Sequence, residues 1–409
     1  MKNPSLTCTR CQKEFPIERV HPRCSSCNEP LEVSYSRLQP SPGRHGEWFG
    51  LREGTLLERY QEFFPFVSIH REISLGEGDT ALLRSSVAAG ELGMEKLFFK
   101  NETQNPTWSF KDRGTVSGIE HAISLGMGKI GTVSTGNMAV SVAAYGARAK
   151  LETYVLVPSG LPKEKIGPIA IYQPHLIMVE GDYGELYFKS LEIGEKQGIC
   201  FINSDVPFRV EGSKTIAFEI CQQMGFHPPD YVVVPVSAGG NLRGILKGFE
   251  EFHQAQLIDR IPKMIVSQAS GCCPVVASFE KGREVIERVL NPRTIAHAIE
   301  NPFPPSGNQV LRKLKENGGT AVRVRDEEII EAQAIMAREG IFGQPAAAVP
   351  LGAVKRLLAK GYLKSTDSVV CIVTGGGLKY TAALEHHSFN VRKVGIERIE
   401  EVIRLTDGE

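Results

Sequence analysis

The chain has 409 residues, of which 42% are hydrophobic and 23% are charged, so it carries enough apolar side chains to bury a large core. Lysine plus arginine and aspartate plus glutamate number 47 each, which excludes the strong net charge that holds nucleic acid or anionic membranes. No run approaches the ~20 apolar residues that cross a bilayer, and the first residues lack the apolar stretch of a signal peptide. We therefore expect a globular, cytoplasmic protein without nucleic-acid or membrane partners, which binds its ligands through local groups.

Four of the nine cysteines lie in the first segment, 1–38, as Cys8-x-x-Cys11 and Cys24-x-x-Cys27. The segment is too short to bury a core of its own, and four thiolates on two tight turns satisfy the tetrahedral coordination of zinc. This spacing predicts a zinc-ribbon-like module with structural Zn²⁺ and no catalytic role; a ribbon that has kept its cysteines without metal is the alternative. The remaining cysteines show no regular spacing and are expected to be packed thiols: Cys200, Cys221, Cys272, Cys273 and Cys371.

From about residue 72 onward, short β-rich runs alternate with amphipathic stretches. This alternation predicts an α/β fold with mostly parallel sheets covered on both faces. Such sheets bind ligands at the carboxyl ends of their strands. Strands are expected at 96–100, 130–133, 153–157, 176–179, 231–236, 264–266 and 369–373, and helices include 138–150, 213–224 and 242–252.

Lys111 stands in the strongest local motif, N-P-T-W-S-F-K-D-R-G at 105–114. Asn-Pro indicates a turn, and Thr107 or Ser109 could start a helix whose first turn contains Lys111. The helix dipole and the nearby Arg113 would then favour the neutral amine, which is the form that attacks an aldehyde. A solvated helix lysine is the alternative if this motif stands alone.

Two further motifs each follow a predicted strand and precede a predicted helix. The first, S-T-G-N at 134–137, offers N–H groups and hydroxyls to an anion, and the Asn137 amide can donate to a phenolate. The second, S-A-G-G-N at 237–241, suits a phosphate monoester, because small residues let the backbone approach and the helix start supplies free donors. Each taken alone is also compatible with simple capping or turn chemistry.

The last motif, T-G-G-G at 374–377, follows the strand predicted at 369–373. The Thr374 hydroxyl could hydrogen-bond a pyridine nitrogen without protonating it, which favours elimination over transamination. The glycine run alone is weak support for this role.

Taken in order, the four motifs resemble those of fold-type-II pyridoxal phosphate enzymes, and most closely the threonine synthase family, from about residue 74 (S-L-G-E-G-D-T) to about residue 379. The resemblance implies that Lys111 holds pyridoxal 5′-phosphate through an imine, that Asn137 binds the ring hydroxyl and that Thr374 meets the pyridine nitrogen. The phosphate of the cofactor would be cradled by Ser237, Ala238, Gly239, Gly240 and Asn241.

The resemblance also implies a fold of two three-layer α/β/α domains next to the N-terminal module. The expected division is 1–38 for the module, 39–94 for a connecting segment that packs on the large domain, 95–215 for a smaller mobile domain with Lys111 and the 134–137 loop, and 216–409 for the large domain with the phosphate loop and Thr374. A homodimer is expected by the same analogy.

The segment 203–215 resembles a stretch of threonine synthases that binds the phosphate of the substrate. The matching positions are Asn203 and Arg209, with Ser134 and Thr135 nearby. The implied reaction converts O-phospho-L-homoserine and water to L-threonine and phosphate. Cysteate synthase, which uses O-phospho-L-serine and sulfite, and a threonine dehydratase-like lyase are alternatives within this chemistry, and a non-enzymatic scaffold is an alternative outside it.

Three positions depart from the family pattern. Trp108 stands where the family usually has glycine, Met138 stands where it has threonine, and Gly376 stands where it has histidine. Met138 removes a hydroxyl that the family directs at the substrate, and Gly376 removes an imidazole near the ring. These departures bear on the substrate, whereas the residues expected to hold the cofactor are all present.

Overall fold

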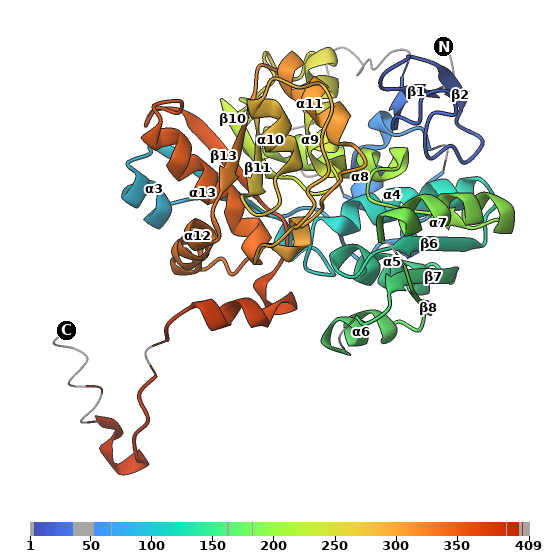
Figure 1. Cartoon of the computed structure of the whole chain (residues 1–409). Coiled ribbons are helices and arrows are strands. Elements are labelled where there is room, and N and C mark those ends of the chain that lie inside the picture. The colour runs from blue at the N-terminus through green and yellow to red at the C-terminus, as the bar shows by residue number, and fades with distance from the viewer. Residues whose placement is uncertain are drawn as a thin grey trace.

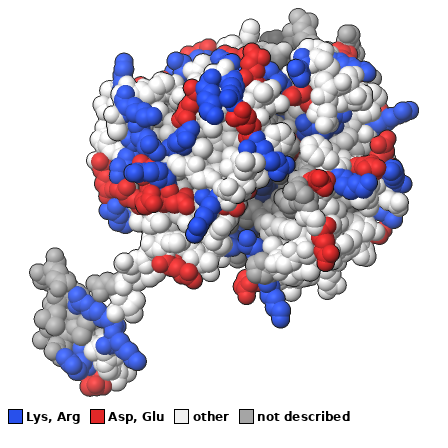
Figure 2. All heavy atoms as spheres, in the orientation of Figure 1, with Lys and Arg blue, Asp and Glu red and all other residues white. Residues whose placement is uncertain are grey.

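The computed structural model describes residues 4–35, 53–66, 68–161, 163–181, 183–389, 391–400 and 403. Its body contains a six-stranded and a four-stranded sheet, and a small three-stranded sheet forms the N-terminal module (Figure 1). No helix in these ranges combines the length and the apolar character that crossing a membrane requires. Basic and acidic side chains are interspersed on the face shown in Figure 2, in keeping with the balanced composition.

The larger sheet is built from β4 (Leu82–Arg84), β5 (Lys96–Asn101), β10 (Tyr231–Pro235), β11 (Lys263–Ala269), β12 (Thr320–Val324) and β13 (Ser368–Val373). Its strand order is β12-β11-β10-β13-β5-β4, and all neighbours are parallel except β4 and β5. All residues of β13 are buried, as expected for a central strand with helices on both faces.

The smaller sheet is wholly parallel and has the order β8-β7-β6-β9. Its strands are β6 (Lys129–Val133), β7 (Glu152–Pro158), β8 (His175–Val179) and β9 (Cys200–Phe201). Every strand predicted from the sequence lies in one of the two large sheets, with ends that agree to within one residue except where the observed strand is longer. The α/β class with mostly parallel sheets and a small N-terminal module is therefore confirmed.

The helices connect these strands. They are α2 (Leu56–Arg59), α3 (Val87–Leu92), α4 (Lys111–Ser124), α5 (Asn137–Arg148), α6 (Lys163–Ala170), α7 (Tyr183–Gln197), α8 (Pro207–Gln223), α9 (Gly240–Gln254), α10 (Pro274–Glu280), α11 (Gly307–Glu316), α12 (Asp326–Arg338) and α13 (Pro345–Ala359). Single turns of 3₁₀ helix occur at η1 (Gln61–Phe63), η2 (Arg71–Ile73), η3 (Glu102–Gln104), η4 (His297–Ile299), η5 (Gly377–Lys379) and η7 (Ile396–Arg398), and η6 (Thr381–His386) is longer.

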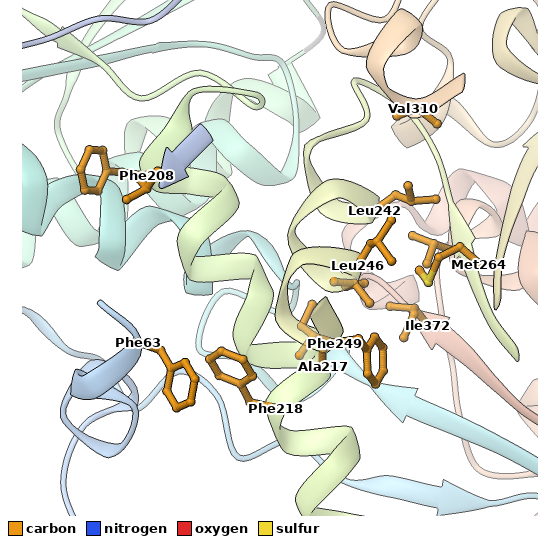
Figure 3. Packing of buried hydrophobic residues seen from close by; sticks show 14 of the residues in the cluster. Phe63, Phe208, Ala217, Phe218, Leu242, Leu246, Phe249, Met264, Val310 and Ile372 are labelled. Carbon is orange, nitrogen blue, oxygen red and sulfur yellow. The ribbon is translucent and has the colours of Figure 1, made fainter. Parts of the chain in front are cut away.

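Helix α8 is the centre of the main core. Every residue from Pro207 to Cys221 is buried, and the helix packs against both α4 and α9. The close approach depends on glycines: a Cβ on Gly212 would lie 2.0 Å from the Arg113 carbonyl oxygen, and one on Gly248 would lie 2.4 Å from that of Lys214. Phe218 of this helix lies beside the ring of Phe63, with centroids 4.9 Å apart (Figure 3). The ring of Phe218 also stacks on that of Phe252 at 4.2 Å. A helix enclosed in this way joins the two sheets into one body.

The N-terminal module is an antiparallel sheet of β1 (Ser5–Cys8), β2 (Glu14–Pro16) and β3 (Leu31–Ser34), in the order β2-β1-β3. It is not an isolated lobe, because Leu6, Leu31 and Val33 belong to the same buried cluster as the residues of α8 and α9. The module and the main body therefore share one hydrophobic core.

The expected domain limits match this organisation only in part. Strand β5 was expected to open the smaller domain, but it pairs with β13 in the six-stranded sheet. Hydrogen bonds between strands determine which sheet β5 joins, and the local pattern of apolar residues does not reveal these bonds. Within the connecting segment 39–94, residues 39–52 and 67 lie outside the described residues, while Phe63 packs on Phe218 and Phe252.

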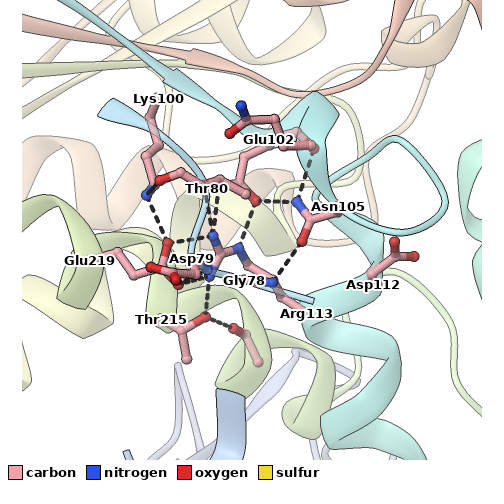
Figure 4. Close-up of polar contacts among 12 residues, drawn as sticks. Gly78, Asp79, Thr80, Lys100, Glu102, Asn105, Asp112, Arg113, Thr215 and Glu219 are labelled. Carbon is pink, nitrogen blue, oxygen red and sulfur yellow. Dashed lines mark hydrogen bonds and ion pairs between the residues drawn. The ribbon is translucent and has the colours of Figure 1, made fainter. Parts of the chain in front are cut away.

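A buried network of charges ties α4 to β5, η3 and α8 (Figure 4). The Arg113 guanidinium, which is fully buried, donates to Glu102 through Nε at 2.6 Å and to Glu219 through two nitrogens at 2.7 Å each. Lys100 Nζ adds a contact of 2.7 Å to Glu219. Burial alone would raise the pKa of Glu219, but the Arg113 and Lys100 charges hold it well below its usual value. The carboxylate is therefore ionised inside the protein and holds two cations.

Replacing Glu219 with glutamine is expected to lower the free energy of unfolding by about 3–5 kcal/mol, because Arg113 and Lys100 then lose the carboxylate that compensates them. Urea unfolding followed by circular dichroism measures the change. The matched control is Glu192→Gln, which removes an exposed carboxylate that also contacts two lysines and should leave the unfolding midpoint unchanged. Equal midpoints for Glu219→Gln and the parent would contradict this role of the network.

Candidate active site

Lys111 is the first residue of α4, and the loop before it lies against the loop that follows β13. Phe110 N donates to the Thr374 carbonyl at 3.1 Å, Gly376 N donates to the Trp108 carbonyl at 2.9 Å, and Ser109 forms an antiparallel bridge with Gly375. This short backbone pairing brings two of the predicted motifs together, although they are separated by more than half of the chain.

The electrostatic environment of Lys111 favours its neutral amine. Burial and, next in size, the Arg209 charge lower the pKa of Lys111 to about 7. Arg209 lies close by, donating to the Lys111 carbonyl at 3.1 Å and to Thr115 Oγ1 at 2.8 Å. The Lys111 nitrogen lies 4.6 Å from the centre of the Phe110 ring and has no hydrogen-bond or ion-pair partner among the described residues. An amine in this state is a nucleophile near neutral pH.

Two sequence-based interpretations around Lys111 are corrected by the structure. Arg113 was expected to depress the pKa of Lys111, but its charge is compensated by Glu102 and Glu219, and the pKa is lowered by burial first and by the Arg209 charge second. Thr107 or Ser109 was expected to cap α4, but no side chain caps the helix at Phe110. The Thr107 hydroxyl instead donates to the Asp112 carboxylate at 2.6 Å, and this bond closes the loop onto the first turn of the helix.

Trp108 has a left-handed backbone conformation, with φ of 58°, which favours glycine. Its side chain is 54% exposed. A Cβ added to Gly376 would lie 3.4 Å from the Trp108 Cβ, so two of the three positions that depart from the family pattern are in contact.

Asn137 is the first residue of α5, which follows a strand of the smaller sheet, and its side chain reaches the loop after β13. Its Nδ2 donates to Gln344 Oε1 at 2.9 Å, and Gln344 N donates to the Gly375 carbonyl at 2.8 Å. A Cβ added to Gly375 would lie 3.0 Å from Asn137 Nδ2, so a glycine is needed for this approach. Gln344 was missed by sequence reasoning; its position at the start of α13, in F-G-Q-P, is a helix-boundary pattern without an evident chemical role.

The predicted phosphate loop follows β10, which is the neighbour of β13 in the sheet. Gly239 has φ of 99°, and α9 starts at Gly240, where a Cβ would lie only 2.2 Å from the Ser204 carbonyl oxygen. Both amide atoms of Asn241 are buried and have no partner in the described part of the chain, and the same holds for Ser109 Oγ. Buried polar atoms without a protein partner can bind a polar ligand. A glycine cradle at a helix start, these free groups and a neutral lysine fit the expected cofactor.

The residues expected to bind the substrate lie at the edge of the smaller sheet. Asn203 is fully buried and holds the end of β6, because its Oδ1 accepts from Val133 N at 3.0 Å and its Nδ2 donates to Ser190 at 3.1 Å. Ser134 and Thr135 follow β6 directly. Next to Asn203, the Ser204 hydroxyl contacts Met138 Sδ at 3.0 Å, which joins this segment to the start of α5.

The four N-terminal cysteines form one cluster, in which all sulfur atoms lie within 4.8 Å of one another. Cys8 and Cys27 are 3.4 Å apart and Cys11 and Cys24 are 3.6 Å apart. A tetrahedral zinc with bonds of ~2.3 Å would separate sulfurs by about 3.8 Å. Backbone N–H groups point at the sulfurs, as Cys11 N does at Cys8 Sγ at 3.4 Å. The cluster fits a metal with four thiolate ligands.

Comparisons with known proteins agree with this geometry. Residues 73–375 match the family described as pyridoxal-phosphate dependent enzyme. The chain is 40% identical over 376 residues to the threonine synthase of Methanocaldococcus jannaschii, covering 91% of this chain and 92% of the relative. It is 36% identical to the threonine synthase of Methanosarcina acetivorans, with coverage of 91% and 92%.

A solved structure of maize serine racemase has the same fold, with a TM-score of 0.64 at 20% identity, covering 80% of this chain and 92% of that one. The fold, the Lys111 environment and the identity over most of the chain lead to one assignment: the chain belongs to the threonine synthase family of pyridoxal-phosphate-dependent enzymes.

Proposed function

We propose that this chain is a pyridoxal-phosphate-dependent lyase that converts O-phospho-L-homoserine and water to L-threonine and phosphate. The observation that carries the proposal is the amine of Lys111, with its pKa lowered to about 7, in a chain 40% identical to a threonine synthase over 91% of its length. The cysteate synthase and dehydratase-like alternatives are not favoured, because the relatives that match over most of the chain are threonine synthases.

The proposed cofactor residues each have a separate task. Asn137 would hold the ring hydroxyl, Thr374 would face the pyridine nitrogen, and the backbone of 237–241 with the Asn241 amide would bind the phosphate. When bound, pyridoxal phosphate supplies a conjugated ring that delocalises the electrons of a deprotonated amino-acid carbon. Lys111 would act as a general base: its free amine would accept the proton from the α-carbon and, once that proton has passed to solvent, one from the β-carbon.

The proposed substrate residues are Ser134, Thr135, Asn203 and Arg209. Hydroxyl and guanidinium donors suit a phosphate group, and a guanidinium can form paired, charge-assisted bonds with it. Asn203, whose amide is engaged by Val133 and Ser190, would act by holding the end of the strand that leads to Ser134 and Thr135. Burial lowers the pKa of Arg209 to about 10, with Asp112 opposing the shift, so the group stays cationic at neutral pH. A cation at this place serves two purposes: it keeps Lys111 neutral and it attracts the leaving phosphate.

Product analysis tests the reaction. Phosphohomoserine should yield threonine and phosphate in equal amounts, whereas phosphoserine with sulfite should yield none. Lys111→Ala should lower turnover by roughly 10³-fold or more, because the base is removed, while Lys360→Ala, at an exposed lysine, serves as the control. Phosphate release from phosphoserine and sulfite alone would establish the cysteate synthase alternative instead.

The rate of covalent cofactor attachment should depend on the neutral fraction of Lys111. Because burial and Arg209 lower the pKa to about 7, attachment should speed up as the pH rises through about 7 and level off above it. Arg209→Met removes the repelling charge and should move this midpoint to higher pH. Arg148→Met, at an exposed position, is the control. Stopped-flow absorbance between pH 6 and 10 measures the midpoint, and a parental midpoint near the ordinary lysine value would contradict the assignment.

We propose that Cys8, Cys11, Cys24 and Cys27 hold structural Zn²⁺. Purified protein should contain about one zinc per chain, and Cys24→Ser should lower this content and the thermal midpoint, because the metal joins both halves of the module. Cys273→Ala, which removes a buried thiol outside the cluster, should keep the metal. A parent chain purified without metal and equally stable in chelator would refute the proposal.

We further propose that the protein acts as a cytoplasmic homodimer on a small phosphorylated substrate. None of the nine cysteines forms a disulfide, which agrees with a reducing compartment. The dimer rests on analogy with the family, and sedimentation analysis would determine the oligomeric state.

A further inference from the structure

Asp205 lies two residues after Asn203, in the segment between β9 and α8, and it gathers contacts from distant parts of the chain. Its carboxylate is 1% exposed and pairs with Arg23 NH1 at 2.8 Å. The Tyr187 hydroxyl also donates to this carboxylate, and Ser306 Oγ lies 3.5 Å from it. A buried carboxylate needs such partners, because the cost of removing its charge from water is large.

Arg23 belongs to the N-terminal module and directly precedes Cys24. Its guanidinium uses three different nitrogens: Nε donates to the Asn28 carbonyl at 2.7 Å, NH1 pairs with Asp205, and NH2 donates to the Pro305 carbonyl at 3.1 Å. The first bond fixes the side chain to its own cysteine turn, and the other two hold segments of the main body. The planar, forked shape of arginine makes this arrangement possible.

The two segments that Arg23 holds are in contact with the phosphate loop. Next to Pro305, Ser306 N donates to the Ala238 carbonyl at 3.1 Å, and a Cβ on Gly239 would lie 2.9 Å from the Ser306 Cβ. Next to Asp205, the Ser204 carbonyl oxygen lies 2.2 Å from the position of a Cβ on Gly240. The loop is therefore packed between Ser204 and Ser306, so a shift of either would disturb it.

Arg243 lies on α9, the helix that begins at the phosphate loop, and it contacts the same segments. It is fully buried and donates to the Asp205 carbonyl at 3.1 Å, to Ser306 Oγ at 3.0 Å and to the Leu31 carbonyl of β3 at 2.9 Å. The module thus reaches the surroundings of the loop through Arg23 and through the contacts of Arg243 with β3. Both arginines contact Asp205 and the segment 305–306.

We propose that Arg23 is a positioning residue for the cofactor-phosphate loop, acting through Asp205 and Pro305, and that the cysteine module is thereby a structural part of the cofactor site. The inference rests on the proposed use of pyridoxal phosphate. Without Arg23, the Asp205 carboxylate stays buried without its cation, and Ser204 and Ser306 lose a common anchor. The loop would then grip a phosphate group less tightly, while contacts to the ring would be unaffected.

The experiment compares two aldehydes that differ only in the phosphate group. Full-length holoenzyme is freed of cofactor and titrated with pyridoxal 5′-phosphate and with pyridoxal, following the visible absorbance. Arg23→Ala should bind pyridoxal phosphate about ten-fold more weakly and pyridoxal as the parent does. Arg23→Lys keeps the charge but not the fork and should fall between them. Arg10→Ala, an exposed arginine on the other cysteine turn, should match the parent.

A general loss of structure would weaken the binding of both aldehydes equally, and this result would overturn the proposal, as would parental affinity of Arg23→Ala for pyridoxal phosphate. If Arg23→Ala does not fold, Asp205→Asn decides in its place: a selective loss for the phosphorylated aldehyde supports the proposal, and an unchanged ratio overturns it. No amino-acid substrate is present, so the result is independent of the turnover test. A parent that binds no pyridoxal phosphate would instead refute the proposed function.

Discussion

The ion pairs of Arg113 with Glu102 and Glu219 fix the position of the first turn of α4, and the site depends on this position. Arg113 lies two residues after Lys111, so the bidentate pairs that hold its guanidinium also hold the first turn of α4. The same carboxylate of Glu219 reaches Lys100 on β5, which lies beside β13 in the sheet. The helix that carries the reactive lysine and the strand that leads to Thr374 are therefore positioned by one buried set of charges.

Two arginines flank Lys111 and have opposite electrostatic consequences. Arg113 is neutralised by two carboxylates in direct contact, whereas Arg209 donates only to a carbonyl and a hydroxyl, with the Asp112 charge acting on it without a direct bond. Only the second lowers the pKa of the lysine. Proximity of a cation is therefore insufficient to predict its effect; the partners of that cation decide it.

Much of the fold and of the site could be predicted from the sequence, because local signals determine these features. Strands β10 and β13 are apolar, β-branched runs, β6 is a shorter β-rich run, and the motifs that follow all three lie where parallel strands end. The four cysteines are likewise read from their spacing.

The remaining features depend on contacts between distant residues. Arg209 lies 98 residues from Lys111 in the chain, and its bond to the lysine carbonyl has no local sign. Strands β5 and β13 are far apart in the sequence, and the pattern of apolar residues in β5 alone fits either sheet. Gln344 and the Arg23–Asp205 pair were missed for the same reason, since each becomes visible only when separate loops are placed side by side.

The enclosure of α8 on all sides has a consequence for how the molecule opens. Its amide hydrogens are covered by both neighbouring helices and by the aromatic cluster, so they should exchange with solvent only when the whole body unfolds. Arg209 lies near the amino end of this helix. The cation beside Lys111 therefore belongs to the segment that we expect to open last. Fragments cut on either side of α8 would each expose a wide apolar surface, so the body cannot be divided there into independently folding pieces.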